Sequence, residues 1–147
     1  KDYEIKGLTN QKDELQIHYD FSVDNLGIKD GEDIILNPTL FKPRITKYKE
    51  GDYTYTRKKT RHRTVDYSYE IEIPETYKVK HLPEDVHYKH NLFGFDATFK
   101  VEEGKIFVSM VYHYHLLEIP PSLWEHWNEF SASINSATIQ NIILEKA

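Results

Sequence analysis

The longest regular pattern in the chain begins at Arg63 and ends at Ile73. Valine, tyrosine and isoleucine at its odd-numbered positions alternate with threonine, aspartate, serine and glutamate at its even-numbered positions. A period of two places the two sets on opposite faces of a β-strand. Pro74 cannot donate to a neighbouring strand and should end it, and a shorter extended stretch is expected from Tyr77 to Leu82. The pattern predicts a long strand in a half-buried antiparallel sheet.

The same alternation predicts further strands on both sides of this one. They are expected at residues 2–6, 15–23, 33–36, 86–91, 93–101 and 105–117. Glu103-Gly104 predicts a hairpin turn between the last two. Both faces of 105–117 carry apolar residues, so we expect this strand to be central and covered on both sides.

One amphipathic helix is expected at about Ser122–Ile134, after Pro120-Pro121 breaks the sheet. Ser122 with Glu125 three residues later matches a capping box, in which each side chain satisfies a free amide of the first turn. Trp124, Trp127 and further apolar residues then recur at helical spacing. The two tryptophans could form a platform for a sugar, but their spacing places them on the apolar face, which favours a role in the core. Residues 139–144 are expected to be extended.

Between Thr39 and His62 the alternation is lost, and lysine, arginine, threonine and tyrosine dominate. We expect a long excursion that crosses between sheets, with a mobile tip around residues 50–52, because it offers little apolar surface for burial. Taken together, the pattern predicts a mainly β fold. The expected architecture is a single-domain antiparallel β-sandwich over residues 1–147, with the C-terminal helix packed on it.

Composition narrows the classes of function. A hydrophobic content of 39% is enough for a core, and the formal net charge of -5 argues against general nucleic-acid binding. No stretch approaches the roughly 20 apolar residues of a membrane helix. The chain has no cysteine, and therefore no disulfide, thiolate metal site or cysteine nucleophile. No cofactor motif is recognisable, and a start at Lys1 without methionine suggests a domain excised from a longer protein.

Two clusters could carry chemistry. His113 and His115 are two residues apart on an expected strand, so both could reach one metal ion. A third ligand, such as His87 or His90, would have to come from elsewhere, and we expect no metal site. Asp66, Glu70 and Glu72 share one face around Ser68 and could act as paired acid and base, although such a row is more typical of a solvated sheet face. We expect no catalytic residue.

The excursion holds the best binding candidates. Tyr48, Tyr53 and Tyr55 are expected to be exposed aromatic residues, and Arg57 and Arg61 belong to a basic run from 57 to 63. That run could contact phosphate or an acidic partner, but a solvated loop is the more common interpretation.

Five segments resemble a known family. They are Ile35-Leu36-Asn37-Pro38, Arg63-Thr-Val-Asp-Tyr, Ile73-Pro-Glu-Thr-Tyr-Lys-Val-Lys-His-Leu-Pro83, Glu118–Phe130 and Gln140–Lys146. They resemble the C-terminal β domain of bacterial transglutaminase-like proteins, from roughly Leu15 onward. The resemblance implies an upstream papain-like core with a Cys-His-Asp triad, none of which lies in this chain. It also implies a periplasmic, outer-membrane-associated or extracellular location.

Two hypotheses of function remain. The first is a non-catalytic accessory or interaction domain, whose partner is the adjacent transglutaminase-like domain of the same chain. The second is a module that binds glycan or peptide through the Tyr48–Tyr55 excursion and the sheet face. A cleft lined by those tyrosines would favour the second, and a flat charged surface would favour the first.

Overall fold

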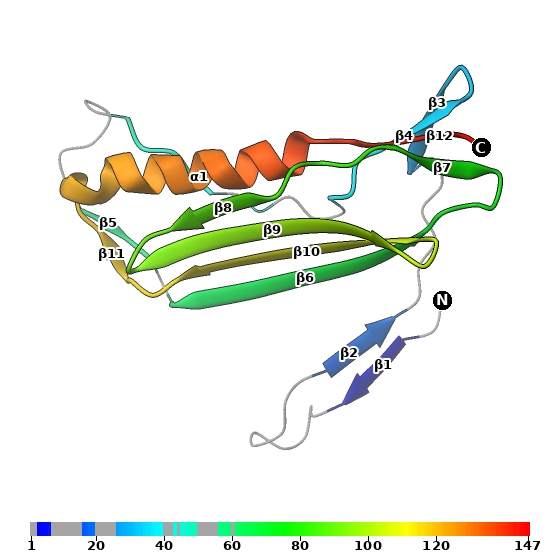
Figure 1. Cartoon of the computed structure of the whole chain (residues 1–147). Helices are drawn as coiled ribbons and strands as arrows, with labels where there is room; N and C mark the ends of the chain where they lie inside the picture. Colours follow the sequence, from blue (N-terminus) through cyan, green and yellow to red (C-terminus); the bar gives the residue numbers. More distant parts are fainter. Residues whose placement is uncertain are drawn as a thin grey trace.

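The computed structural model describes residues 3–6, 16–19, 26–39, 43, 45–49, 56–59 and 61–147. The fold is mainly β, with antiparallel sheets and one C-terminal helix, as the sequence predicts (Figure 1). The expected mobile tip at residues 50–52 lies outside the described residues, as do Tyr53 and Tyr55.

The first four-stranded sheet has the strand order β6-β10-β9-β8. It consists of β6 (Arg63–Glu72), β8 (Val86–Lys89), β9 (Phe93–Glu102) and β10 (Lys105–Tyr114). β6 spans the predicted alternation almost to its end, and β9 and β10 form the predicted hairpin. Glu103 and Gly104 both have positive φ, 50° and 74°, as a tight two-residue turn requires.

The two faces of this sheet differ in burial. On one face, β9 and β10 present fully buried aromatic and aliphatic side chains, and β6 adds half-buried tyrosines. On the other face, the odd-numbered residues of β10, from Phe107 to His113, are only half-buried. β10 is central, as predicted, but the expectation that both of its faces are covered is wrong. The neighbouring residues of β6 and β9 on this side, among them Glu70, Asp96 and Lys100, are exposed, and we call this second face the open face.

The second four-stranded sheet has the order β3-β4-β12-β7. It joins β3 (Gly27–Asp30), β4 (Asp33–Leu36), β7 (Tyr77–His81) and β12 (Ile142–Lys146). Two smaller pairs complete the described strands: β1 (Tyr3–Lys6) with β2 (Gln16–Tyr19), and β5 (Arg57–Lys58) with β11 (Glu118–Ile119). β3, β5 and β11 are not predicted from the sequence, and β5 and β11 have only two residues each, too few to show a period.

Helix α1 (Trp124–Ile139) begins later and ends later than predicted. Ser122 lies in the 3-10 turn η1 (Pro121–Leu123), and neither η1 nor α1 has a side-chain cap. The predicted capping box is therefore wrong: Leu123 N–H donates to the Pro120 carbonyl at 2.9 Å, so the backbone closes this turn without Ser122. The predicted apolar stripe is confirmed, since Trp127, Phe130 and Ile134 are buried.

A single hydrophobic core joins these elements. Figure 1 shows α1 and the second sheet lying end to end above the first sheet, so that together they cover one of its faces. The buried cluster accordingly contains residues of all three, among them Trp127, Ile142 and Val108. No helix in the described ranges has the length and apolar character needed to cross a membrane.

The excursion is anchored more firmly than its composition predicts. Asn128 of α1 donates to the Tyr48 carbonyl and accepts from the Tyr48 N–H at 2.7 Å. Trp127 and Ser131 donate to the carbonyls of Thr46 and Ile45. Residues 45–49 are thus fixed along α1 by polar side chains of the helix.

Candidate functional site

The open face of the first sheet carries two cross-strand rows of residues suited to binding. One row brings together three hydroxyl groups, Ser68 of β6, Ser109 of β10 and Thr98 of β9. The next row places Phe107 between Glu70 and Lys100. These six residues line a hollow of about 320 Å³. The arrangement combines an aromatic floor, hydroxyl donors and acceptors, and one charge of each sign.

A second, larger hollow adjoins the first. Its volume is about 580 Å³, and it shares Ser68, Tyr69 and Glu70 with the smaller one. Its remaining described lining residues come from β6 and from the region of β3 and β4: Leu26, Leu36, Asn37, Pro38, Ile71 and Glu72. Leu36 and Ile71 pack against the core, whereas Glu70 and Glu72 are on the open face, so this hollow lies around the free edge of β6. Both volumes fall in the range of small-molecule sites.

Ion pairs set the charge around these hollows. Lys105 Nζ lies 3.1 Å from Glu70 Oε2, and this hydrogen bond, followed by the charge of Glu70, raises the pKa of Lys105. His87 Nδ1 lies 2.9 Å from Asp96 Oδ1 on the same face. Ser68 donates to Asp66 at 3.3 Å. Among the described residues, neither Lys100 nor Glu72 forms an ion pair, although the charge of Glu72 also contributes to the raised pKa of Lys105.

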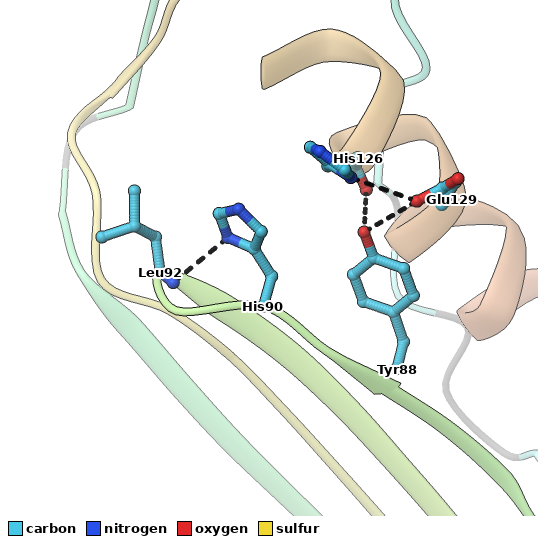
Figure 2. Close-up of polar contacts among 5 residues, drawn as sticks. All are labelled: Tyr88, His90, Leu92, His126 and Glu129. Atoms are coloured by element: carbon cyan, nitrogen blue, oxygen red, sulfur yellow. Dashed lines mark hydrogen bonds and ion pairs between the residues drawn. The ribbon is translucent and has the colours of Figure 1, made fainter.

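A second polar cluster joins the edge strand β8 to helix α1 (Figure 2). The Tyr88 hydroxyl donates to the His126 carbonyl at 2.9 Å and to Glu129 Oε2 at 3.0 Å, while His126 Nδ1 lies 3.3 Å from the same carboxylate oxygen. Burial and then the Glu129 carboxylate raise the pKa of Tyr88 to about 12. The contacts hold the start of the helix against β8.

His90 completes this cluster. Its Nδ1 accepts from the Leu92 N–H at 3.2 Å, so neutral His90 carries its proton on Nε2. Its ring stacks on Phe93 with a centroid distance of 4.2 Å and lies 5.4 Å from the His126 ring. The hydrogen bond from the Leu92 N–H occupies Nδ1 of His90. Because Nε2 then carries the proton, that nitrogen has no lone pair for a metal ion. The cluster is thus better suited to joining β8 and α1 than to holding a metal.

The predicted metal candidates lie close together. The rings of His113 and His115 are 5.1 Å apart between centroids, and His62 stacks on His115 at 6.3 Å. His113 fits there because Gly94 has no side chain: a Cβ on Gly94 would lie 2.8 Å from His113 Cε1. Within the described ranges, no three His, Cys, Asp or Glu side chains are placed to share a metal ion.

Of the predicted binding residues of the excursion, Tyr48, Arg57 and Arg61 belong to the described part of the chain, and these three are not gathered into a site. The expectation that Tyr48 is exposed is wrong: its side chain is 5% exposed and packs on Trp124 and Trp127. Its backbone is fixed by Asn128, which turns the ring into the core. Arg57 lies 6.0 Å from the Tyr48 ring, whereas Arg61 is exposed.

The basic run is also partly docked onto the core. Lys59 Nζ lies 4.9 Å from the Trp127 ring, and burial lowers the pKa of Lys59. Lys59 N–H also donates to the Leu117 carbonyl at 2.7 Å. This part of the run is therefore not the solvated loop that the sequence suggests.

Comparison with known proteins places the chain in one family. A family model described as a domain of unknown function with a solved structure (DUF3858) matches residues 32–144. No characterised protein and no solved structure matches the chain significantly.

Proposed function

Because the chain belongs to the DUF3858 family of domains of unknown function, we propose that it is a non-catalytic accessory domain that binds its ligand on the open face of the first sheet and around the adjoining edge of β6. The observation that carries the proposal is the pair of adjoining hollows along β6, which share Ser68, Tyr69 and Glu70. A hollow of this size with apolar walls and a few polar groups is the usual form of a binding site.

The groups around the hollows are suited to binding rather than to reaction. Ser68 is hydrogen bonded to Asp66, and no histidine occurs among the described residues that line either hollow. Glu70 is paired with Lys105 on a solvated surface. A nucleophile needs a base within hydrogen-bond reach, and a carboxylate at such a surface is a weak base.

The open face also replaces the excursion as the ligand surface. Tyr48 is buried and Arg57 lies against it, so these two residues support the core. Glycan or peptide remains a possible ligand class for the sheet face, where Phe107 and the three hydroxyls lie side by side.

The resemblance to bacterial transglutaminase-like proteins supplies a context for this function. In that context the domain lies C-terminal to a papain-like core, in an envelope protein, and the core is its natural partner. The test is the reading frame upstream of Lys1: a core with a Cys-His-Asp triad there supports the context, and an unrelated upstream domain contradicts it.

Binding on the open face can be tested with a single thiol, because the chain has no cysteine. We expect a fluorophore on Ser109→Cys to respond to the cognate ligand in a panel of peptides, glycans and the upstream core. The same fluorophore on Ser136→Cys, at an exposed position of α1, serves as the control. A response at residue 136 alone, or chemical conversion of the ligand, would contradict the proposal.

A further inference from the structure

The larger hollow differs from the smaller one in the charge of its lining. Leu26, Leu36, Pro38 and Ile71 supply apolar walls, and Glu70 and Glu72 are its charged residues among those described. No lysine or arginine occurs among the described residues that line it. The hollow therefore combines apolar surface with negative charge at one side.

The two carboxylates are not equivalent. Glu70 is already paired with Lys105 at 3.1 Å. Glu72 lies directly opposite Lys105 in the β6–β10 ladder, but no ion pair to it occurs among the described residues. A cation in the hollow would therefore meet Glu72 first, without having to displace Lys105 from Glu70.

We propose that the larger hollow binds a small organic cation with an apolar body, an alkylammonium or arylammonium compound. The apolar body would lie against Leu26, Leu36 and Ile71, and the ammonium group would donate to the Glu72 carboxylate. The proposal rests on the proposed binding function, and it names the ligand class of the hollow at the β6 edge.

Physical chemistry favours this class over the alternatives. A charge-assisted hydrogen bond from an ammonium group to a carboxylate is about twice as strong as a neutral one. An anionic amphiphile would place its charge beside Glu70 and Glu72, where like charges repel. A neutral amphiphile would gain the apolar contacts, at about 25 cal/mol per Å² of buried surface, but not the charge pair.

The test compares three probes with the same chain length: octylammonium, octanoate and octan-1-ol, each below its aggregation concentration, with isothermal titration calorimetry at about 0.15 M salt. We expect octylammonium to bind at least about tenfold more tightly than either of the other two. Equal binding of octanoate, or tighter binding of octanol, would overturn the proposal.

Matched variants locate the site. Glu72→Gln should weaken octylammonium binding by about tenfold, whereas Glu102→Gln should not change it. Glu102 makes a fair control because it also lies opposite Lys105 in the ladder and lines neither hollow. An equal loss of octylammonium affinity in the two variants would show that the amine is attracted by the overall negative charge of the sheet and not by Glu72. That result would overturn the proposal.

The apolar wall is tested in the same way. Leu26→Ser should weaken binding, and Ile28→Ser should leave it unchanged, although Ile28 is the more exposed of the two, at 68% against 43%. If Leu26→Ser has no effect, the amine does not occupy this hollow.

The binding experiments also distinguish a failure of the organic-cation proposal from a failure of the proposed binding function. If no amine binds while a peptide or the upstream core still changes the fluorescence at residue 109, the ligand class is wrong and the binding face stands. If neither binds, both proposals fail.

Discussion

At the scale of single residues, Tyr88 shows how one hydroxyl joins two elements. It reaches from β8 to the carbonyl of His126 and the carboxylate of Glu129 (Figure 2). Both acceptors require that the phenol keep its proton, and this requirement, added to burial, raises its pKa.

Tyr88→Phe is therefore expected to have an effect that depends on pH. The pKa of Tyr88 is about 12 in the folded protein, above the ordinary value of 10.0, so its stabilising contribution is complete below pH 10 and is lost as the pH rises through 12. Denaturant titrations should show wild type more stable than the variant by about 1 kcal/mol at pH 8, and this advantage should be lost and then reversed as the pH approaches 12. Other ionisable groups occur in both proteins and cancel in the difference. A difference that stays constant from pH 8 to pH 12 would contradict this assignment.

Only some residues of the candidate site can be placed from the sequence alone. The alternation between residues 63 and 73 already places Ser68 and Glu70 on one solvated face. It cannot show that Ser109 and Thr98 lie beside Ser68, because this depends on the register of three strands. Nor can it place Leu26 opposite β6, since that wall belongs to another sheet region.

At the scale of elements, α1 both fills the core and fixes the excursion. Its apolar stripe packs on β8 and β9, and Asn128 on its flank binds the backbone of Tyr48 from both sides. A segment with few apolar residues is held in place by hydrogen bonds to its main chain.

Asn128→Ala should release this segment. Two hydrogen bonds of about 1 kcal/mol each are lost, so the free energy of unfolding should fall by about 2 kcal/mol, and amides of residues 45–49 should exchange faster. Asn135→Ala, at an exposed position of the same helix, is the control and should change stability by less than about 0.5 kcal/mol. Unchanged exchange at Tyr48 would show that other contacts hold the segment.

The elements themselves were predictable where they are long and periodic. β6, β9, β10 and the buried stripe of α1 follow from their spacing alone. The helix ends do not follow from spacing, because the burial of Ala137 and Thr138 carries the helix past the predicted end, and Pro120 and Pro121 open it with a 3-10 turn. Tertiary contacts decide where a helix begins and ends, and these contacts cannot be read from the local spacing of apolar residues.

At the scale of the whole molecule, β12 holds the second sheet together. It lies between β4 and β7, and its residues Ile142 and Leu144 are buried in the common core. The partners of this strand are separated widely along the chain, since Leu36 pairs with Ile142.

Leu144→Ala should therefore destabilise the entire fold by about 2–5 kcal/mol, through lost burial and the cavity left behind. Ile143→Ala, one residue away and only half-buried, should cost clearly less. Chemical denaturation followed by tryptophan fluorescence measures both, because Trp124 and Trp127 lie in the shared core. A larger effect at Ile143 would mean that the other face of this sheet carries the packing.

The position of β12 also has a consequence for the order in which the protein is made. A ribosome releases a chain from its N-terminus, so β4 and β7 are complete long before the strand that separates them. Until residues 142–146 emerge, each of those two strands has an open edge of the kind that attracts other chains. The domain therefore acquires its native fold only after residues 142–146 have emerged, and a product of translation that is interrupted before them lacks the strand that would make it native.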